Sequence, residues 1–154
     1  MNHDTRETFW KAFAESPFIM MKLEGSNEHS VPMTAQLDKD AHHAVWFFLP
    51  RENRLAAGGP AMGQVSTKGH DVFACISGLL TEETDQTIRE KHWNRVVESW
   101  YPNGKNDPAI IMHRFDIKDS EVWTSDLSVK GKFKMLVGLP INPKESGDHA
   151  TGPV

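Results

Sequence analysis

The sequence has little cysteine and no excess of basic residues, and each shortage excludes a class of protein. Its single cysteine, Cys75, lies in an apolar run, so no disulfide can form within the chain. This predicts a buried, inert thiol and a reducing, cytoplasmic location. The 17 basic and 21 acidic residues give a net charge of −4. A nucleic-acid-binding protein would present clustered basic residues, so we expect no such partner.

Long hydrophobic runs and familiar catalytic motifs are also missing. No apolar segment approaches the roughly 20 residues of a membrane-spanning helix, and no basic stretch followed by an apolar one marks a signal peptide. The motifs of serine hydrolases, zinc peptidases, phosphate-binding loops and CxxC proteins do not occur. Of the eight histidines, only His42 and His43 are adjacent, and neighbours on a strand face opposite ways. We therefore expect surface histidines and no metal site.

What the 154 residues do contain is the pattern of one domain dominated by β-strands. Apolar segments predict strands at 18–24, 29–38, 43–50, 62–67, 70–81, 109–117, 121–125 and 132–138. Pro32, within the second strand, must lie on a sheet edge or at a bulge. The third strand is apolar at nearly every position, so it should be buried on both faces.

Helical patterns occur in three places. The first helix begins at a cap formed by Asp4 or Thr5 and ends at Ser16. Residues 51–59 suggest one or two helical turns closed by glycine. Residues 81–100 suggest a longer helix with acidic residues in its first turn. The apolar face of this longer helix consists of Ile88, Trp93, Val96, Val97 and Trp100.

The order of elements predicts a mainly β, α+β fold, because strands and helices do not alternate as in a parallel sheet. The best match is an antiparallel β-barrel with peripheral helices. A barrel of this size is filled by its own side chains, so a ligand must bind at a rim or between subunits. We assign the barrel to residues 1–139. Residues 140–154 are polar and rich in proline and glycine, and predict a loosely ordered tail.

Two segments have the composition of a site for a planar ligand with an anionic tail. Residues 32–34 offer edge-strand backbone groups that the proline frees from the sheet. Residues 47–54 supply an apolar wall and two arginines. The alternative is a core strand followed by a solvated loop. Trp100 and Tyr101 pose a similar choice, because two aromatics before the dense turn at 102–108 suit either packing or a ligand wall.

The order of these motifs resembles that of a known family. The matching segments are TFWKAFAESPFIMM, HSVPMTAQ, VWFFLPRENR, DVFACISGLL, WNRVVESWYPNGKNDP and SEVWTS. They resemble the general stress protein branch of the pyridoxamine 5′-phosphate oxidase-like family, the FMN-binding split barrels, and the resemblance covers about residues 5–137. The segment WYPNGKNDP is the most specific. The resemblance implies that this turn closes a helix and leads into the second half of a split barrel.

The resemblance also implies a homodimer with two FMN molecules at its interface. The backbone of residues 32–34 would bond the pyrimidine edge of the flavin, and residues 47–49 would line the ring and ribityl chain. The following loop would hold the phosphate, and a tryptophan from the second subunit would approach the ring. The residues assigned to FMN in this way are Pro32, Met33, Thr34, Phe47, Phe48, Leu49, Arg51, Asn53, Arg54, Lys68 and Trp123.

The sequence departs from the family pattern in three places. Leu49 stands where the family often has threonine, which removes a hydroxyl. The loop at 53–55 lacks the usual lysine, so the positive charge must come from Arg51, Arg54 and Lys68. The Arg-x-His-x-Arg signature of true pyridoxamine phosphate oxidases is absent, which argues against pyridoxal phosphate synthesis. These departures predict weaker retention of FMN or a changed ligand.

The sequence thus predicts an FMN-binding protein, either a flavin-dependent oxidoreductase of unknown substrate or a flavin carrier. No side chain stands out as a proton donor or nucleophile, so the flavin would supply the chemistry. The alternative is a non-catalytic protein that has kept the fold and binds another planar ligand or a partner protein. Leu49 and Leu55 favour this alternative.

Overall fold

The computed structural model of the protein describes residues 1–125 and 149–154. Its strands are β1 (Phe18–Leu23), β2 (Val31–Thr34), β3 (Ala44–Pro50), β4 (Gly59–Ser66), β5 (Val72–Glu82), β6 (Ile110–Thr124) and β7 (His149–Thr151). Its helices are α1 (His3–Glu15), α2 (Gln86–His92) and α3 (Arg95–Trp100). The predicted strand at 132–138 lies outside the described residues. Within the described ranges, no helix is long and apolar enough to cross a membrane.

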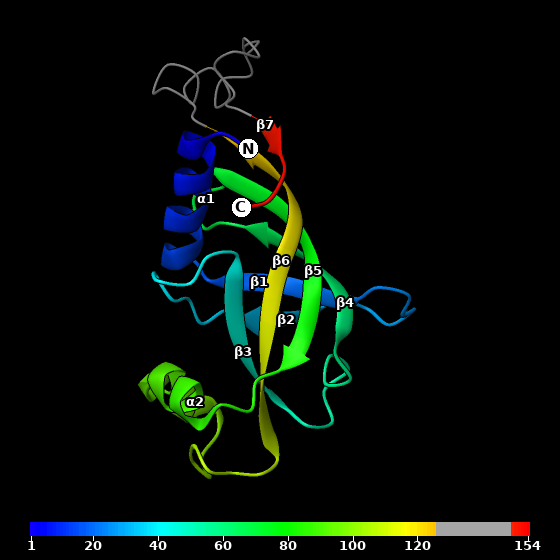
Figure 1. Ribbon diagram of the computed structural model, residues 1–154, viewed down its shortest axis with the longest axis vertical. Coiled ribbons are helices and arrows are strands. Elements are labelled where there is room, and N and C mark those ends of the chain that lie inside the picture. The colour runs from blue at the N-terminus through cyan, green and yellow to red at the C-terminus, as the bar shows by residue number, and fades with distance from the viewer. Residues whose placement is uncertain (126–148) are drawn as a thin grey trace.

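The strands form one antiparallel sheet in the order β2-β1-β4-β5-β6-β3, with β7 beside β6. Two backbone hydrogen bonds between Gln36 and Trp46, of 2.7 and 3.0 Å, link the chain after β2 back to β3. The sheet therefore curls into a barrel. In Figure 1, β5 and β6 run along it as long curved strands, α1 lies beside its upper part, and α2 lies at its lower end. The predicted split antiparallel barrel with peripheral helices is confirmed.

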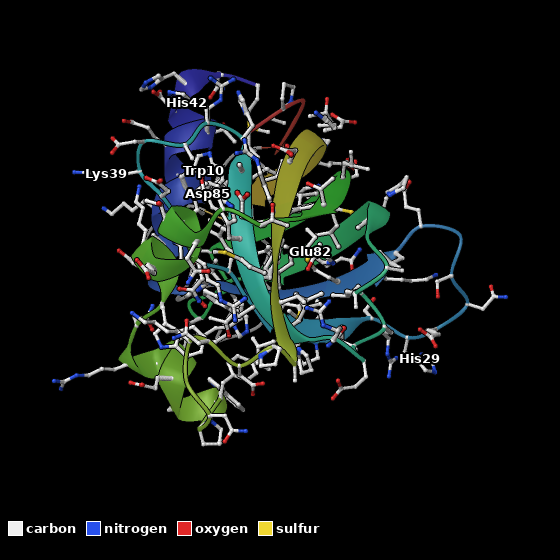
Figure 2. The ribbon with its side chains drawn as sticks, turned by 60° about the horizontal axis from the view of Figure 1, so that its bottom comes forward. Trp10, His29, Lys39, His42, Glu82 and Asp85 are labelled. Atoms are coloured by element: carbon white, nitrogen blue, oxygen red, sulfur yellow. The ribbon has the colours of Figure 1, made fainter. Side chains whose placement is uncertain are left out.

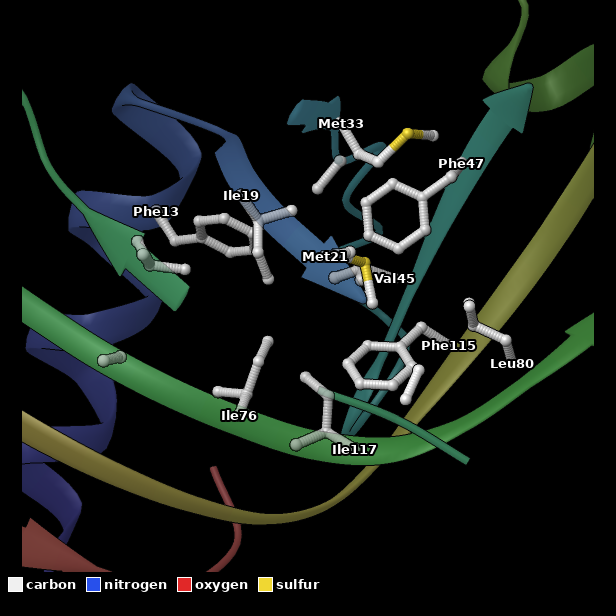
Figure 3. Close-up of a cluster of buried hydrophobic side chains, with 14 of the residues drawn as sticks. Phe13, Ile19, Met21, Met33, Val45, Phe47, Ile76, Leu80, Phe115 and Ile117 are labelled. Atoms are coloured by element: carbon white, nitrogen blue, oxygen red, sulfur yellow. The ribbon is translucent and has the colours of Figure 1, made fainter. Parts of the chain in front are cut away.

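The barrel interior is filled by apolar side chains that alternate along the strands. Figure 3 shows this cluster, which includes Ile19, Met21, Val45, Phe47, Ile76, Leu80, Phe115 and Ile117. The outer face of β3 is also covered, because Trp46 and Phe48 belong to a second cluster with Val97 of α3. The prediction that this strand is buried on both faces is confirmed.

The first helix begins earlier than predicted. Asn2 is its cap, and the Asn2 side chain accepts a hydrogen bond of 2.8 Å from the Thr5 amide. Neither Asp4 nor Thr5 caps the helix, because both lie within its first turn. The cap position before that turn is occupied by Asn2. Phe9 and Phe13 face the barrel and are fully buried.

The helix predicted at 81–100 is wrong in its continuity. The structure contains two short helices, because Asn94 adopts an extended conformation and its side chain accepts a hydrogen bond of 2.9 Å from the Val97 amide. A side chain of this kind competes with the helical backbone and starts a new helix. The predicted apolar face is also interrupted, since Val96 and Trp100 are 63% and 73% exposed.

The segment after β3 is a series of turns rather than a helix. Backbone hydrogen bonds join Asn53 to Pro50, Ala56 to Asn53 and Gly58 to Leu55, each across three residues. The Asn53 side chain accepts a further bond of 2.9 Å from the Leu55 amide, which favours a turn. Gly58 then has a positive φ of 69°, which starts a chain reversal into β4.

The strands predicted at 109–117 and 121–125 are one continuous strand, β6. The polar residues between them suggested a break, but Ser120 is buried and its hydroxyl donates to the Gly152 carbonyl. The tail prediction is wrong for its last six residues, because β7 pairs with β6 and Val154 is fully buried. A buried polar group with a partner belongs to a strand as readily as an apolar one.

The second helix is held against β3 by an aromatic stack. His92 of α2 is 6% exposed, and its ring lies 4.8 Å from the Trp46 ring, at 26° to it. The Trp46 indole also donates a 3.1 Å hydrogen bond to Glu83. Burial lowers the pKa of His92 and outweighs the opposing effect of the Asp38 carboxylate, so the ring packs in its neutral form.

The sheet has an irregular register between Ser77 and Gly78 of β5, where it faces β6. A Cβ added at Gly78 would lie only 2.0 Å from the Asp116 carbonyl oxygen. We expect Gly78→Ala to lower the free energy of unfolding in urea by about 1–3 kcal/mol, because two backbones must separate. The control is Gly69→Ala, whose added Cβ would be 3.4 Å from its nearest neighbour. Equal stability of the two variants would contradict the close approach of the two backbones at Gly78.

The neutral His92 ring predicts a pH dependence of stability. The unfolded chain takes up a proton near the ordinary histidine pKa of 6.5, whereas the folded chain does so only at lower pH. The contribution of His92 is therefore present above pH 6.5 and lost as the pH falls below it, by at most about 1.4 kcal/mol per pH unit. Urea unfolding between pH 7.5 and 5 should show a shallower loss for His92→Phe. Parallel curves for variant and wild type would exclude His92 as the cause.

Candidate functional site

A cavity of about 400 Å³ opens between β2, the end of β3 and α3. It brings together the predicted site residues Pro32, Met33, Thr34, Phe48, Leu49 and Asn53. The edge strand and the apolar strand lie far apart in the sheet order, and the barrel brings them together through the link between Gln36 and Trp46. Closure of the barrel therefore creates this cavity.

The cavity wall is apolar with a few neutral polar groups. Every described residue that lines it has an uncharged side chain, and the polar ones include Thr34, Gln36 and Asn53. The strand β2 is terminal in the sheet, so the backbone groups on its side away from β1 remain available, as Pro32 predicted. Apolar walls with a few fixed polar groups suit a flat ring system that has one polar edge.

The aromatic pair at the end of α3 forms another wall of this cavity. Trp100 and Tyr101 both line it, with Val96 and Val97 of the same helix and Phe18 of β1. Tyr101 is half-buried and donates a 3.0 Å hydrogen bond to the Phe48 carbonyl. Burial raises the pKa of Tyr101, so the phenol stays protonated and keeps this bond.

Tyr101 thus packs against β3, whereas Trp100 borders the cavity, and a role of this pair as a ligand wall stays a prediction. The sequence prediction of site residues nevertheless omitted Phe18 and the residues of α3. The aromatic pair before the turn was a usable signal. Phe18 and Val96 carried none, because single apolar residues at element ends are common.

Five predicted site residues do not line this cavity: Phe47, Lys68, Trp123 and the two arginines, Arg51 and Arg54. Phe47 is 1% exposed and points into the barrel interior. Lys68 lies in the turn between β4 and β5. Trp123 stacks on His149 of β7, with ring centres 5.0 Å apart. Phe47 shares the core cluster with Met33 and Leu49, and Trp123 lines a second cavity together with Pro32.

The two arginines of the loop after β3 point to different places. Arg51 donates through Nε to the Pro108 carbonyl at 3.1 Å, and its guanidinium lies 3.8 Å from Glu82. Arg54 donates to the His29 carbonyl at 2.9 Å. Figure 2 shows Glu82 and His29 well apart. Arg54 thus ties the loop to the segment that leads into β2, whereas Arg51 lines a separate hollow with Glu82 and Asp107.

The loop after β3 is held on its inner side by the barrel core and by a histidine of β6. Leu55 is 2% exposed and belongs to the barrel core. The Nε2 atom of His113, on β6, lies 3.1 Å from the Leu55 carbonyl oxygen and 3.0 Å from that of Ala56. His113 is 2% exposed, so the expectation of surface histidines is wrong for this residue and for His92. A histidine between apolar neighbours on a strand was the available signal.

A second cavity, of about 580 Å³, adjoins the first and shares Phe18 and Pro32 with it. Phe73 and Trp123 line it and are each 41% exposed, while Phe18 is 61% exposed. Cys75 also borders it and is half-buried, so the prediction of a buried thiol is wrong. Exposed aromatics around a hollow are unusual on a surface that faces only water.

Comparison with protein families gives a match over most of the chain. The family described as "Pyridoxamine 5′-phosphate oxidase like" matches residues 4–140. No curated protein matches the sequence. The matched range includes both cavities and the loop after β3.

Solved structures give a consistent result. The general stress FMN/FAD binding protein of Xanthomonas citri is 38% identical, with a TM-score of 0.77 over 83% of this chain and 94% of that protein. A general stress family protein of Xanthomonas campestris pv. campestris is 37% identical, with a TM-score of 0.74 over 82% and 90% of the two chains. A protein of Jannaschia sp. CCS1 assigned to general stress protein 26 is 23% identical, with a TM-score of 0.82 over 99% and 100%.

Proposed function

The chain belongs to the pyridoxamine 5′-phosphate oxidase-like family, and on that premise we propose that it binds FMN in the cavity between β2, β3 and α3. The observation that carries the proposal is the meeting of an open strand edge with an apolar wall in one cavity. The Xanthomonas citri relative, described as FMN/FAD-binding, supports a flavin as the ligand.

The residues present fit the ring of a flavin. Met33 and Thr34 would face its polar edge with their backbone, and Phe48 and Leu49 would lie against its apolar part. Thirteen residues line the cavity without a charge, which suits a neutral ring but not a phosphate. The phosphate would therefore lie toward Asn53 and Arg54 at the loop.

The bound flavin would supply electron transfer, and the protein would set its position, polarity and access. We propose a flavin-dependent oxidoreductase of unknown substrate, and the description of the matching family, which names an oxidase, supports this. The alternative, a non-catalytic binding protein, draws support from Leu49, which replaces a hydroxyl in the wall. Leu55 no longer supports it, because this side chain fills the core and leaves the loop surface unchanged.

We further propose that the protein is a cytoplasmic homodimer with the flavin at its subunit interface. The exposed side chains of Phe18, Met20, Phe73 and Trp123 line the second cavity, which shares Phe18 and Pro32 with the first. Exposed apolar surface of this kind favours association. A second copy would cover it and would bring its own Trp123 near the ring.

The proposal is tested by titrating the apo protein with flavin and monitoring the fluorescence of the flavin ring. We expect about micromolar or tighter affinity for FMN, with one FMN per chain, because the cavity excludes water from most of the ring. Light scattering should give the mass of two chains. A protein that binds neither FMN nor riboflavin would contradict the proposed function and favour the alternative.

The two arginines provide a matched pair for locating the phosphate. Arg54→Ala should weaken FMN binding by about 10-fold or more, because a charge-assisted hydrogen bond contributes roughly 1.5–3 kcal/mol. Arg51→Ala should change it by less than about threefold, since Arg51 is engaged with Pro108 and Glu82. Riboflavin, which has no phosphate, should bind both variants like the wild type. The opposite order of the two arginines would place the phosphate on the other side of the loop.

A further inference from the structure

His113 occupies a position where an apolar side chain would be expected. It lies on β6 between Ile111 and Phe115, and all three side chains face the barrel interior. Strand β3 pairs with it on one side through Phe47, and β5 pairs with it on the other through Glu82. The ring is therefore enclosed by a core that leucine or phenylalanine would fill at lower cost.

The hydrogen bonds of His113 define its tautomer. Its Nε2 atom faces the carbonyl oxygens of Leu55 and Ala56, and carbonyl oxygens only accept. The proton is therefore on Nε2, which donates to both. The Nδ1 atom is buried and has no partner among the described residues. An imidazole with one unpaired buried nitrogen is an expensive core residue, so the benefit must come from the two carbonyl groups that Nε2 holds.

These carbonyl groups belong to the loop that carries Asn53 and Arg54. Its other internal bonds are local: Ala56 bonds to Asn53, and Gly58 to Leu55. Two bonds tie the loop to other segments, from the Arg51 amide to the Ala109 carbonyl and from Arg54 to the His29 carbonyl, but neither holds the peptide groups of Leu55 and Ala56. Leu55 anchors it by apolar packing, which lacks direction, whereas the bonds from His113 determine which way two successive peptide groups face.

We propose that His113 is a positioning residue for the phosphate of the bound flavin nucleotide. It orients the loop after β3 so that Asn53 and Arg54 meet the phosphate in one geometry. The inference rests on the proposed function, because it requires a phosphate-bearing flavin in the neighbouring cavity. It predicts that His113 affects the preference for FMN over riboflavin and leaves the binding of the ring itself unchanged.

The test compares FMN and riboflavin affinities in three variants. His113→Leu fills the core without a donor, and His113→Asn keeps an amide too short to reach the loop. His113→Gln places an amide nitrogen near the Nε2 position. We expect the leucine and asparagine variants to lose about tenfold in FMN affinity, with riboflavin affinity within about threefold of wild type. The glutamine variant should recover most of the FMN preference. Circular dichroism checks that each variant is folded.

The outcomes separate this inference from the proposed function. A wild-type protein that binds neither flavin contradicts both. A wild type that prefers FMN, with leucine and asparagine variants that keep the same preference, overturns the role of His113 alone. Equal weakening of both ligands also overturns it, because it indicates general loss of structure. If neither variant folds, NMR of the wild type can measure how fast the His113 Nε2 proton exchanges with solvent. This exchange should be slower with FMN bound than with riboflavin bound. Equal rates would refute the proposal.

Discussion

The pairing of β6 with β3 on one side and β5 on the other is the constraint on which the rest of the structure depends. This strand of 15 residues holds the two halves of the barrel together. Its alternation sends Phe115 into the interior and Met112 outward to the cluster beneath α3. Because β3 is fixed along its whole length by this pairing, its end and the following loop have one position relative to β2, and the cavity between them is formed before any ligand arrives.

A preformed cavity and a fixed loop both lower the free-energy cost of binding, because they are ordered when the chain folds. The cost of ordering the loop is met during folding by Leu55 in the core and by the turn that Asn53 stabilises. Binding then need not order that segment again, which favours affinity. The neutral wall, with Arg54 in the loop that follows β3, would suit a ligand that has an apolar ring and a charged tail. A flavin nucleotide has both parts, in agreement with the assignment to the family.

The sequence predicted much of the fold and part of the site, and the failures have physical causes. Strand positions followed from hydrophobic patterns, and Pro32 correctly indicated an edge. The break at Asn94 was missed because a side-chain cap competes with the helix at a single residue. The sequence cannot say where the two arginines point, since that depends on carbonyl partners distant in the chain. The burial of His113 had a signal in its apolar strand, but its carbonyl partners could not be predicted, because they are 57 and 58 residues away.

Pro32 also has a consequence for how copies of this protein meet. An open strand edge normally recruits strands from other chains and leads to aggregates. Proline lacks the amide that a new ladder would need, and β2 has only four residues, so the edge is a poor template for strand addition. Extension of the sheet by a second copy is therefore disfavoured at this edge. Pro32, which leaves backbone groups of β2 available to a small molecule, thus also protects this edge from aggregation by strand addition.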